Sequence, residues 1–221
     1  MPDTTATPQA SLRITEIFHS LQGESTRVGL PTVFIRLTGC PLRCIWCDTE
    51  YAFSGGKSWP LQDVLATVAS FECPVVCVTG GEPLAQKDCT ALMTALCDAS
   101  YDVSLETSGA LDLAGVDRRV AKIMDIKPPG SGEAEKNLWS NLALLTPHDE
   151  IKFVLAGESD YAWAKQVLQQ RKLSNLCPVL FSPVSDRLEP ALLADWILRD
   201  RLPVRYQLQL HKLLWGTERG R

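Results

Sequence analysis

The chain has 221 residues, of which 45% are hydrophobic and 22% charged, and 22 Lys and Arg against 26 Asp and Glu leave a net charge of −4. This composition excludes a mostly disordered chain, and the acidic balance disfavours nucleic acid or an anionic membrane as a partner. No apolar run approaches the roughly 18 residues of a membrane span, and the N-terminus lacks the pattern of a secretory signal. We therefore expect a cytoplasmic protein, with a flexible tail over residues 1–10 and a single domain over residues 11–221.

Apolar runs rich in β-branched residues alternate with segments of helical periodicity along most of the chain. The runs predict strands over residues 12–17, 32–37, 74–78, 102–106, 120–126, 150–155, 177–181 and 204–210. Apolar residues at helical spacing predict helices over residues 61–68, 92–96, 161–173 and 190–198. This alternation is typical of parallel strands joined by right-handed crossovers. Because a closed eightfold barrel usually needs about 250 residues, we expect an α/β fold of the incomplete, parallel β/α barrel type.

Unusual loop sequences follow five of the predicted strands. In chain order they are TGCPLRCIWCDT, TGGEP, ETSG, KPPGSG and SPVSD, and they come after the strands that begin at residues 32, 74, 102, 120 and 177. The carboxyl ends of parallel strands share one edge of the sheet, which is where α/β proteins bind their ligands. The sequence therefore predicts one active-site mouth built from these five loops.

Three of the eight cysteines, Cys40, Cys44 and Cys47, are clustered with Cys-x3-Cys-x2-Cys spacing. Gly39 and Pro41 disfavour a regular helix there and favour a loop that wraps its thiolates around a metal centre. An iron–sulfur cluster held by three thiolates would keep one iron open to a small ligand. A structural zinc site and a coincidental spacing are the alternatives. The other cysteines are expected to fill the core: Cys73, Cys77, Cys89, Cys97 and Cys177.

The cysteine loop GCPLRCIWCDT resembles the CxxxCxxC loop of the radical S-adenosylmethionine (SAM) superfamily, including the Trp before the third cysteine. TGGEP at residues 79–83 is similar to the GGEP motif of the same superfamily. Together with EIFHSLQGE at residues 16–24, ETSG and the terminal QLHK, these motifs resemble one family, 7-carboxy-7-deazaguanine synthase, over nearly the whole chain. A glycyl-radical activase and a zinc-stabilised binding module are the alternatives, but neither explains SLQGE.

The resemblance implies a lyase that converts 6-carboxy-5,6,7,8-tetrahydropterin to 7-carboxy-7-deazaguanine with loss of ammonia, in queuosine and 7-deazapurine biosynthesis. It implies a [4Fe–4S] cluster, SAM and Mg²⁺ as cofactors. SAM is cleaved to a radical that takes a hydrogen atom from C6 of the substrate, before a Mg²⁺-assisted ring contraction. A flavodoxin- or ferredoxin-type electron donor and a homodimer are also implied.

The resemblance further assigns roles to individual positions. Cys40, Cys44 and Cys47 would hold the cluster, and the hydroxyl of Thr49 would bind Mg²⁺. The positions that match the substrate pocket are Leu21, Gln22, Gly23, Arg36 and Thr79, with the guanidinium of Arg36 suited to the substrate carboxylate. The positions that match SAM contacts are Trp46, Cys47, Asp48, Gly81, Glu82, Asp125, Ile126, Lys127, Ser182, Pro183, Val184 and Ser185. DIK at residues 125–127 departs from the family's SerProLys-like loop in its first two residues.

Overall fold

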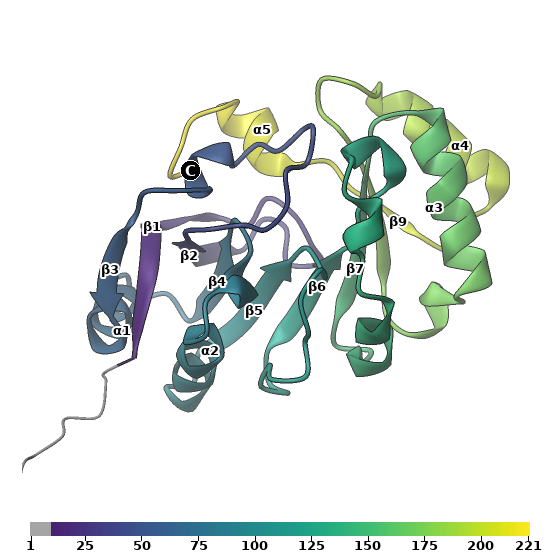
Figure 1. Cartoon of the computed structure of the whole chain (residues 1–221). Coiled ribbons are helices and arrows are strands. Elements are labelled where there is room, and N and C mark those ends of the chain that lie inside the picture. Colours follow the sequence, from purple (N-terminus) through teal and green to yellow (C-terminus); the bar gives the residue numbers. More distant parts are fainter. Residues whose placement is uncertain (1–9) are drawn as a thin grey trace, which may run out of the picture.

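The computed structural model describes residues 10–221, so the expected tail over residues 1–10 lies, apart from Ala10, outside the described residues. The described chain forms a curved sheet with helices packed on its outer face (Figure 1). The strands are β1 (Ser11–Leu21), β2 (Pro31–Leu37), β3 (Lys57–Pro60), β4 (Val75–Gly80), β5 (Asp102–Thr107), β6 (Ala121–Asp125), β7 (Glu150–Leu155), β8 (Val179–Pro183) and β9 (Arg205–Tyr206). The α-helices are α1 (Leu61–Ala69), α2 (Cys89–Asp98), α3 (Glu158–Gln170), α4 (Pro190–Asp200) and α5 (Leu210–Trp215).

The strands follow the order β3-β1-β2-β4-β5-β6-β7-β8-β9 in one sheet that stays open among the described residues. All pairs from β2 to β9 are parallel, which confirms the incomplete parallel β/α barrel. The expectation of a parallel arrangement was wrong for the first strand, because β1 pairs antiparallel with both β2 and β3. The connection over residues 22–30 is too short for a crossover, which takes about a dozen residues or more.

The sequence reading was also wrong at two other places. It missed β3, a short edge strand whose sequence KSWP carries no apolar alternation. It predicted one strand over residues 204–210, where the chain pairs with β8 only over Arg205–Tyr206 and then continues into α5. The alternating Leu208 and Leu210 resemble a strand, but the pairing with β8 ends at Gln207, whose backbone N–H donates to Phe181 O. The side chains of Gln207 and Gln209 bond to the connection after β1.

The core lies between the sheet and the helices on its outer face. The central strands are buried on both faces, as expected for a parallel sheet, and Val64, Leu92, Phe153 and Leu193 are among the side chains with no more than 1% exposure. Four of the five scattered cysteines are buried and Cys97 is half-buried, which confirms that they fill the core. Within residues 10–221, no helix is both long and apolar enough to cross a membrane.

Candidate active site

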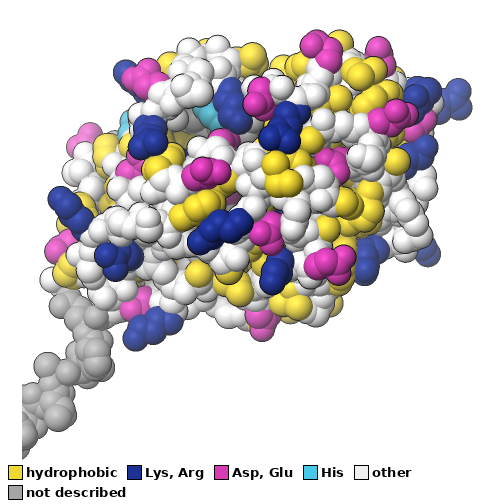
Figure 2. Space-filling model, turned by 45° about the horizontal axis from the view of Figure 1, so that its top comes forward, with side chains coloured by type: hydrophobic (Ala, Val, Ile, Leu, Met, Phe, Trp, Pro, Cys, Tyr) yellow, Lys and Arg dark blue, Asp and Glu magenta, His cyan; other side chains and the backbone are white. Residues whose placement is uncertain are grey.

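A pocket opens at the edge of the sheet formed by the carboxyl ends of the parallel strands. The structure brings all five predicted loops to it, through Cys40–Thr49, Thr79–Gly81, Glu106–Ser108, Asp125–Pro128 and Val184. The connection after β1 and the segment around α5 complete the wall, and α5 lies at this same end of the molecule (Figure 1). Figure 2 turns this end toward the reader and shows positive and negative side chains intermixed over it. The pocket is the site at which the predicted chemistry can take place.

The three clustered cysteines line this pocket as free thiols. Burial raises the pKa of Cys40 and raises that of Cys44 to about 11, against the opposing charge of Lys127 on Cys44. The thiols of Cys40 and Cys44 are therefore protonated at neutral pH in the metal-free chain, and binding of a metal centre there would release protons. The loop that carries them fits closely against the TGGEP loop, because a Cβ on Gly81 would lie 2.3 Å from the carbonyl oxygen of Gly39.

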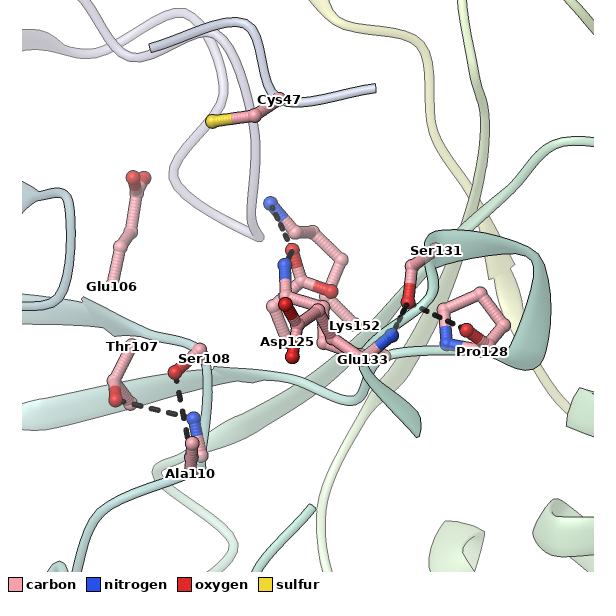
Figure 3. A network of polar contacts seen from close by, with 12 residues as sticks. Cys47, Glu106, Thr107, Ser108, Ala110, Asp125, Pro128, Ser131, Glu133 and Lys152 are labelled. Carbon is pink, nitrogen blue, oxygen red and sulfur yellow. Dashed lines mark hydrogen bonds and ion pairs between the residues drawn. The ribbon is translucent and has the colours of Figure 1, made fainter. Parts of the chain in front are cut away.

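Two carboxylates and two lysines form an ion network in the pocket. The ammonium of Lys152 contacts the carboxylate of Glu24 and lies 3.5 Å from that of Asp125, which also pairs with Lys127 at 3.0 Å. Figure 3 shows Asp125 and Lys152 together below Cys47, with Glu106 on the other side of the same space. Burial would raise the pKa of Glu24, but Lys152 and a bond from Gln209 lower it to about 2, so the pair stays ionised.

Two predicted substrate residues, Gln22 and Thr79, are joined through a carboxylate that the sequence reading did not assign. The amide of Gln22 donates to Glu106 over 3.3 Å, and the hydroxyl of Thr79 donates to the other oxygen of Glu106 over 2.9 Å. Gln22 is 2% exposed and comes from the connection after β1, whereas Thr79 and Glu106 end β4 and β5. The fold therefore brings these three polar side chains together in the wall of the pocket.

Arg36 reaches the pocket from β2 with one side of its guanidinium already occupied. Its Nε donates to Glu16 over 2.7 Å, and the hydroxyl of Tyr51 donates to the same oxygen over 2.8 Å. Burial would lower the pKa of Arg36, but Tyr51 and Glu16 raise it, so the side chain remains cationic. Among residues 10–221, neither terminal nitrogen of Arg36 has a hydrogen-bond partner. The guanidinium is thus held in place with a free face, as recognition of a carboxylate requires.

Comparison with known proteins identifies the family. The Radical SAM superfamily matches residues 34–174. A 7-carboxy-7-deazaguanine synthase of Chlorobaculum tepidum is 48% identical, over 95% of this chain and 97% of its own length. One from Koribacter versatilis is 43% identical, over 94% of this chain and 98% of its own. The crystal structure of QueE from Escherichia coli has the same fold, with a TM-score of 0.74 at 23% identity and coverage of 91% and 95%.

The chain belongs to the 7-carboxy-7-deazaguanine synthase family. As a radical SAM enzyme it has a [4Fe–4S] cluster and SAM as its cofactors. The matches to these relatives cover 95% and 94% of the chain, which sets aside the glycyl-radical activase and the zinc-stabilised module.

The residues of this 7-carboxy-7-deazaguanine synthase family member fit such a cluster. Within residues 10–221, no three His, Cys, Asp or Glu side chains converge closely enough to enclose one metal ion. The three thiols line one pocket without enclosing a single ion, which suits a larger cluster better than a tetrahedral zinc centre. Thiolates are also the ligands that iron–sulfur clusters take.

The structure separates the residues predicted to contact SAM into two groups. Trp46, Cys47, Asp48, Gly81, Asp125, Lys127 and Val184 line the pocket, whereas Glu82, Ile126, Ser182, Pro183 and Ser185 lie outside its lining. Glu82 has no exposed surface, and its carboxylate accepts bonds from Leu84 N, from Thr107 Oγ1 and from the amide and hydroxyl of Ser108. Its role in this structure is to fix Thr107 and Ser108, which do line the pocket.

Several pocket residues were not assigned from the sequence. Examples are Glu24, Glu106, Lys152, Gln209, His211 and Lys212. Lys152 carried a signal, because a lysine inside the apolar run EIKFVL is rarely buried without a partner. The other five lie within the motifs SLQGE, ETSG and QLHK, which contribute to the family resemblance, but the resemblance assigned no role to these side chains. His19 does not line the pocket and packs near Phe71.

Glu24→Gln is expected to lower the free energy of unfolding at pH 7, because it leaves the buried Lys152 with Asp125 alone. Loss of one partner of a buried ion pair costs about 3–5 kcal/mol, and we expect the lower end here. The pKa of Glu24 is lowered from 4.5 to about 2, so its stabilising contribution is present above pH 4.5 and is lost as the pH falls toward 2. Urea denaturation from pH 7 to pH 3 measures both effects, and an equal gap between the two proteins at every pH would contradict the pairing.

Proposed function

We propose that this chain is a radical SAM lyase that converts 6-carboxy-5,6,7,8-tetrahydropterin to 7-carboxy-7-deazaguanine and ammonia, in queuosine and 7-deazapurine biosynthesis. The single observation that carries the proposal is the free face of Arg36 in a pocket that the three cysteines also line. The substrate is an anion through its carboxylate, and a buried guanidinium is the group that recognises a carboxylate in two parallel bonds. The family's relatives support the reaction.

The polar groups opposite Arg36 suit the rest of a pterin. A reduced pterin presents several N–H donors, and the wall of the pocket offers acceptors in Glu106 and Gln209. Gln209 Nε2 donates to Glu24, which leaves its Oε1 buried and without a partner among the described residues. Because a buried polar atom is rarely left without a hydrogen bond, this oxygen is a candidate acceptor for a substrate N–H.

When bound, the cluster and SAM supply one-electron chemistry that removes a hydrogen atom from a carbon of the substrate. We propose that Cys40, Cys44 and Cys47 hold the cluster. We propose that the predicted SAM residues that line the pocket hold SAM next to it. The protein's own contribution is then to bind the carboxylate at Arg36, to orient the ring against Glu106 and to keep water away. This division explains why one pocket combines thiols, a cation and buried carboxylates.

The experiment that tests the proposal is anaerobic turnover of the reconstituted protein. The protein with iron and sulfide restored would be mixed with SAM, a chemical reductant and 6-carboxy-5,6,7,8-tetrahydropterin, and the products would be followed by mass spectrometry. We expect loss of ammonia from the substrate and no net consumption of SAM. A brown, cluster-loaded protein that cleaves SAM but leaves this pterin unchanged would overturn the substrate assignment.

We further propose that Thr49 binds Mg²⁺ together with oxygens of the substrate, since Mg²⁺ prefers oxygen ligands in an octahedral shell. Thr49 lines the pocket and precedes the short helix Glu50–Ala52, but its hydroxyl makes no capping bond to that helix and lies 3.7 Å from Cys47 Sγ. The alternative, in which Thr49 caps the turn, therefore lacks its hydrogen bond.

Thr49→Val is expected to abolish stimulation of turnover by Mg²⁺ while leaving cluster content and melting temperature unchanged. Valine keeps the shape of threonine but removes the hydroxyl oxygen that the proposal assigns to the ion. Titration of Mg²⁺ against turnover in both proteins measures this effect. Parallel curves for the two proteins would count against a metal role for Thr49.

From the family resemblance we also propose a homodimer, a flavodoxin- or ferredoxin-type electron donor and a single radical SAM domain over residues 11–221. A cytoplasmic location is supported by the cysteines, because eight free thiols suit a reducing compartment.

A further inference from the structure

Two segments far apart in the chain bind each other along their length beside the pocket. One is the substrate loop, residues 22–25, which follows β1, and the other is the segment Gln207–His211 after β9, which we call the clamp. Gln207 is 6% exposed, and its amide accepts a bond from Ser25 N and donates one to Ser25 O, each over 2.7 Å. Leu210 N donates to Gly23 O over 2.9 Å.

Side-chain packing joins the same two segments. A Cβ on Gly23 would lie 2.2 Å from Nδ1 of His211, so only glycine lets the substrate loop approach the clamp this closely. Gln209 reaches across to the carboxylate of Glu24. Within the described residues, the hydrogen bonds that tie the backbone of Gly23 and Ser25 to other parts of the fold all come from the clamp.

The contact between the substrate loop and the clamp joins two ends of the open sheet. The substrate loop leaves β1 near one end of the open sheet, and the clamp leaves β9 at the other end. No strand pair among residues 10–221 joins these two ends, so the clamp makes the connection that strand pairing would make in a closed barrel. Side-chain bonds from Gln22 to Glu106 and from Lys152 to Glu24 also hold the loop. Its backbone at Ser25, however, is held to the rest of the fold by Gln207, a residue that does not itself line the pocket.

We propose that Gln207 is a positioning residue that fixes the substrate loop in its binding-competent conformation. The proposal rests on the proposed function in one respect, namely that the loop contacts the substrate. Without Gln207, the loop would populate other conformations as well. The affinity for substrate would then fall in proportion to the fraction of molecules whose loop is in the binding-competent conformation. Bound substrate would restore that conformation, so the effect falls on KM and not on kcat.

Gln207→Ala tests the proposal, with Gln207→Asn as a milder variant that keeps an amide on a side chain one methylene shorter. We expect KM for the pterin to rise about tenfold or more in Gln207→Ala while kcat stays within about threefold, because two hydrogen bonds to the loop are lost. The KM of Gln207→Asn should lie between those of the wild type and Gln207→Ala. Hydrogen–deuterium exchange of the peptide over residues 22–30 should be faster in both variants in the absence of substrate.

Tyr161→Phe is the matched control. The Tyr161 hydroxyl also makes two bonds in the interior, to Trp196 O over 2.8 Å and to Asp200 over 2.7 Å, but it joins α3 to α4 away from the pocket. We expect it to lower the melting temperature without changing KM or the exchange over residues 22–30. If Gln207→Ala behaves like Tyr161→Phe, the residue is only structural and the proposal is overturned.

The measurements distinguish a failure of the proposed function from a failure of the clamp proposal. If the wild-type protein does not turn over the pterin, the proposed function fails, but the exchange measurement still tests the clamp. If the wild-type protein is active and both Gln207 variants match it in KM and in exchange, the clamp fails while the function stands.

Discussion

Cys44→Ala is expected to remove the iron–sulfur cluster and all SAM cleavage. Cys40, Cys44 and Cys47 line one side of the pocket, and within residues 10–221 no other cysteine lines it and could replace a lost thiolate. Two thiolates cannot hold a cluster that is open at one iron, so anaerobic iron and sulfide analysis should fall from about four of each per chain to near zero. The absorbance that makes such proteins brown should disappear with them.

The matched controls are Cys97→Ala and Cys89→Ala, in α2. Cys97 is half-buried and Cys89 is fully buried, and neither lines the pocket. Cys89→Ala should lower stability, because burial of the thiol in the core is lost, but both variants should keep their iron. Nearly full iron content and SAM cleavage in Cys44→Ala would sink the assignment of the cluster to this loop.

Arg36→Ala is expected to lower kcat/KM for the pterin by about 10²–10³-fold or more, since loss of a buried charge partner costs about 3–5 kcal/mol. Arg36→Lys should also be impaired, because a lysine keeps the charge but not the paired donors that face a carboxylate. Steady-state kinetics with varied substrate measures the loss. Binding of SAM, which we propose to lie on the cysteine side of the pocket, should be unchanged in both variants.

Arg119→Ala is a suitable control for the removal of an arginine. Arg119 pairs with Asp98 and Asp117 on the surface, where it is half exposed, and such pairs contribute little. Its kcat/KM should match the wild type. If substrate affinity in Arg36→Ala also matched the wild type, Arg36 would serve only to hold Glu16 and Tyr51, and another group would have to bind the carboxylate.

The fold was predictable from the sequence wherever its signal is local. Strands β4 and β7 carry the apolar runs VVCV and FVL, and the helices that follow them, α2 and α3, have regular periodicity, so the alternation indicates the parallel part of the sheet. The positions of the unusual loops also followed, because parallel strands leave their carboxyl ends at one edge. The direction of β1 was not predictable in this way, since it depends on a turn without a distinctive sequence.

Site residues that belong to short motifs could be predicted from the sequence. Site residues that are brought together by contacts between distant parts of the chain could not. The cysteines and Gly81 come from compact motifs with fixed spacing. The partners of Glu24, by contrast, are Lys152 and Gln209, which lie 128 and 185 residues away. Nothing in the residues around Gln209 indicates that contact, because its amide donates to a carboxylate that is distant in the sequence.

The clamp also bears on the order in which this protein matures. The cysteine loop and the glycines that fit against it lie in the first 81 residues, and the further partners of its backbone, Ser131 and Glu133, lie in the middle of the chain. The substrate loop waits for Gln207, which is 182 residues after Ser25, and contacts at such separations form late. We therefore expect the cluster to be able to bind to its loop before the substrate loop has reached its final conformation. A nascent chain could receive its cluster first and gain the capacity to bind a pterin only when its last strand is in place.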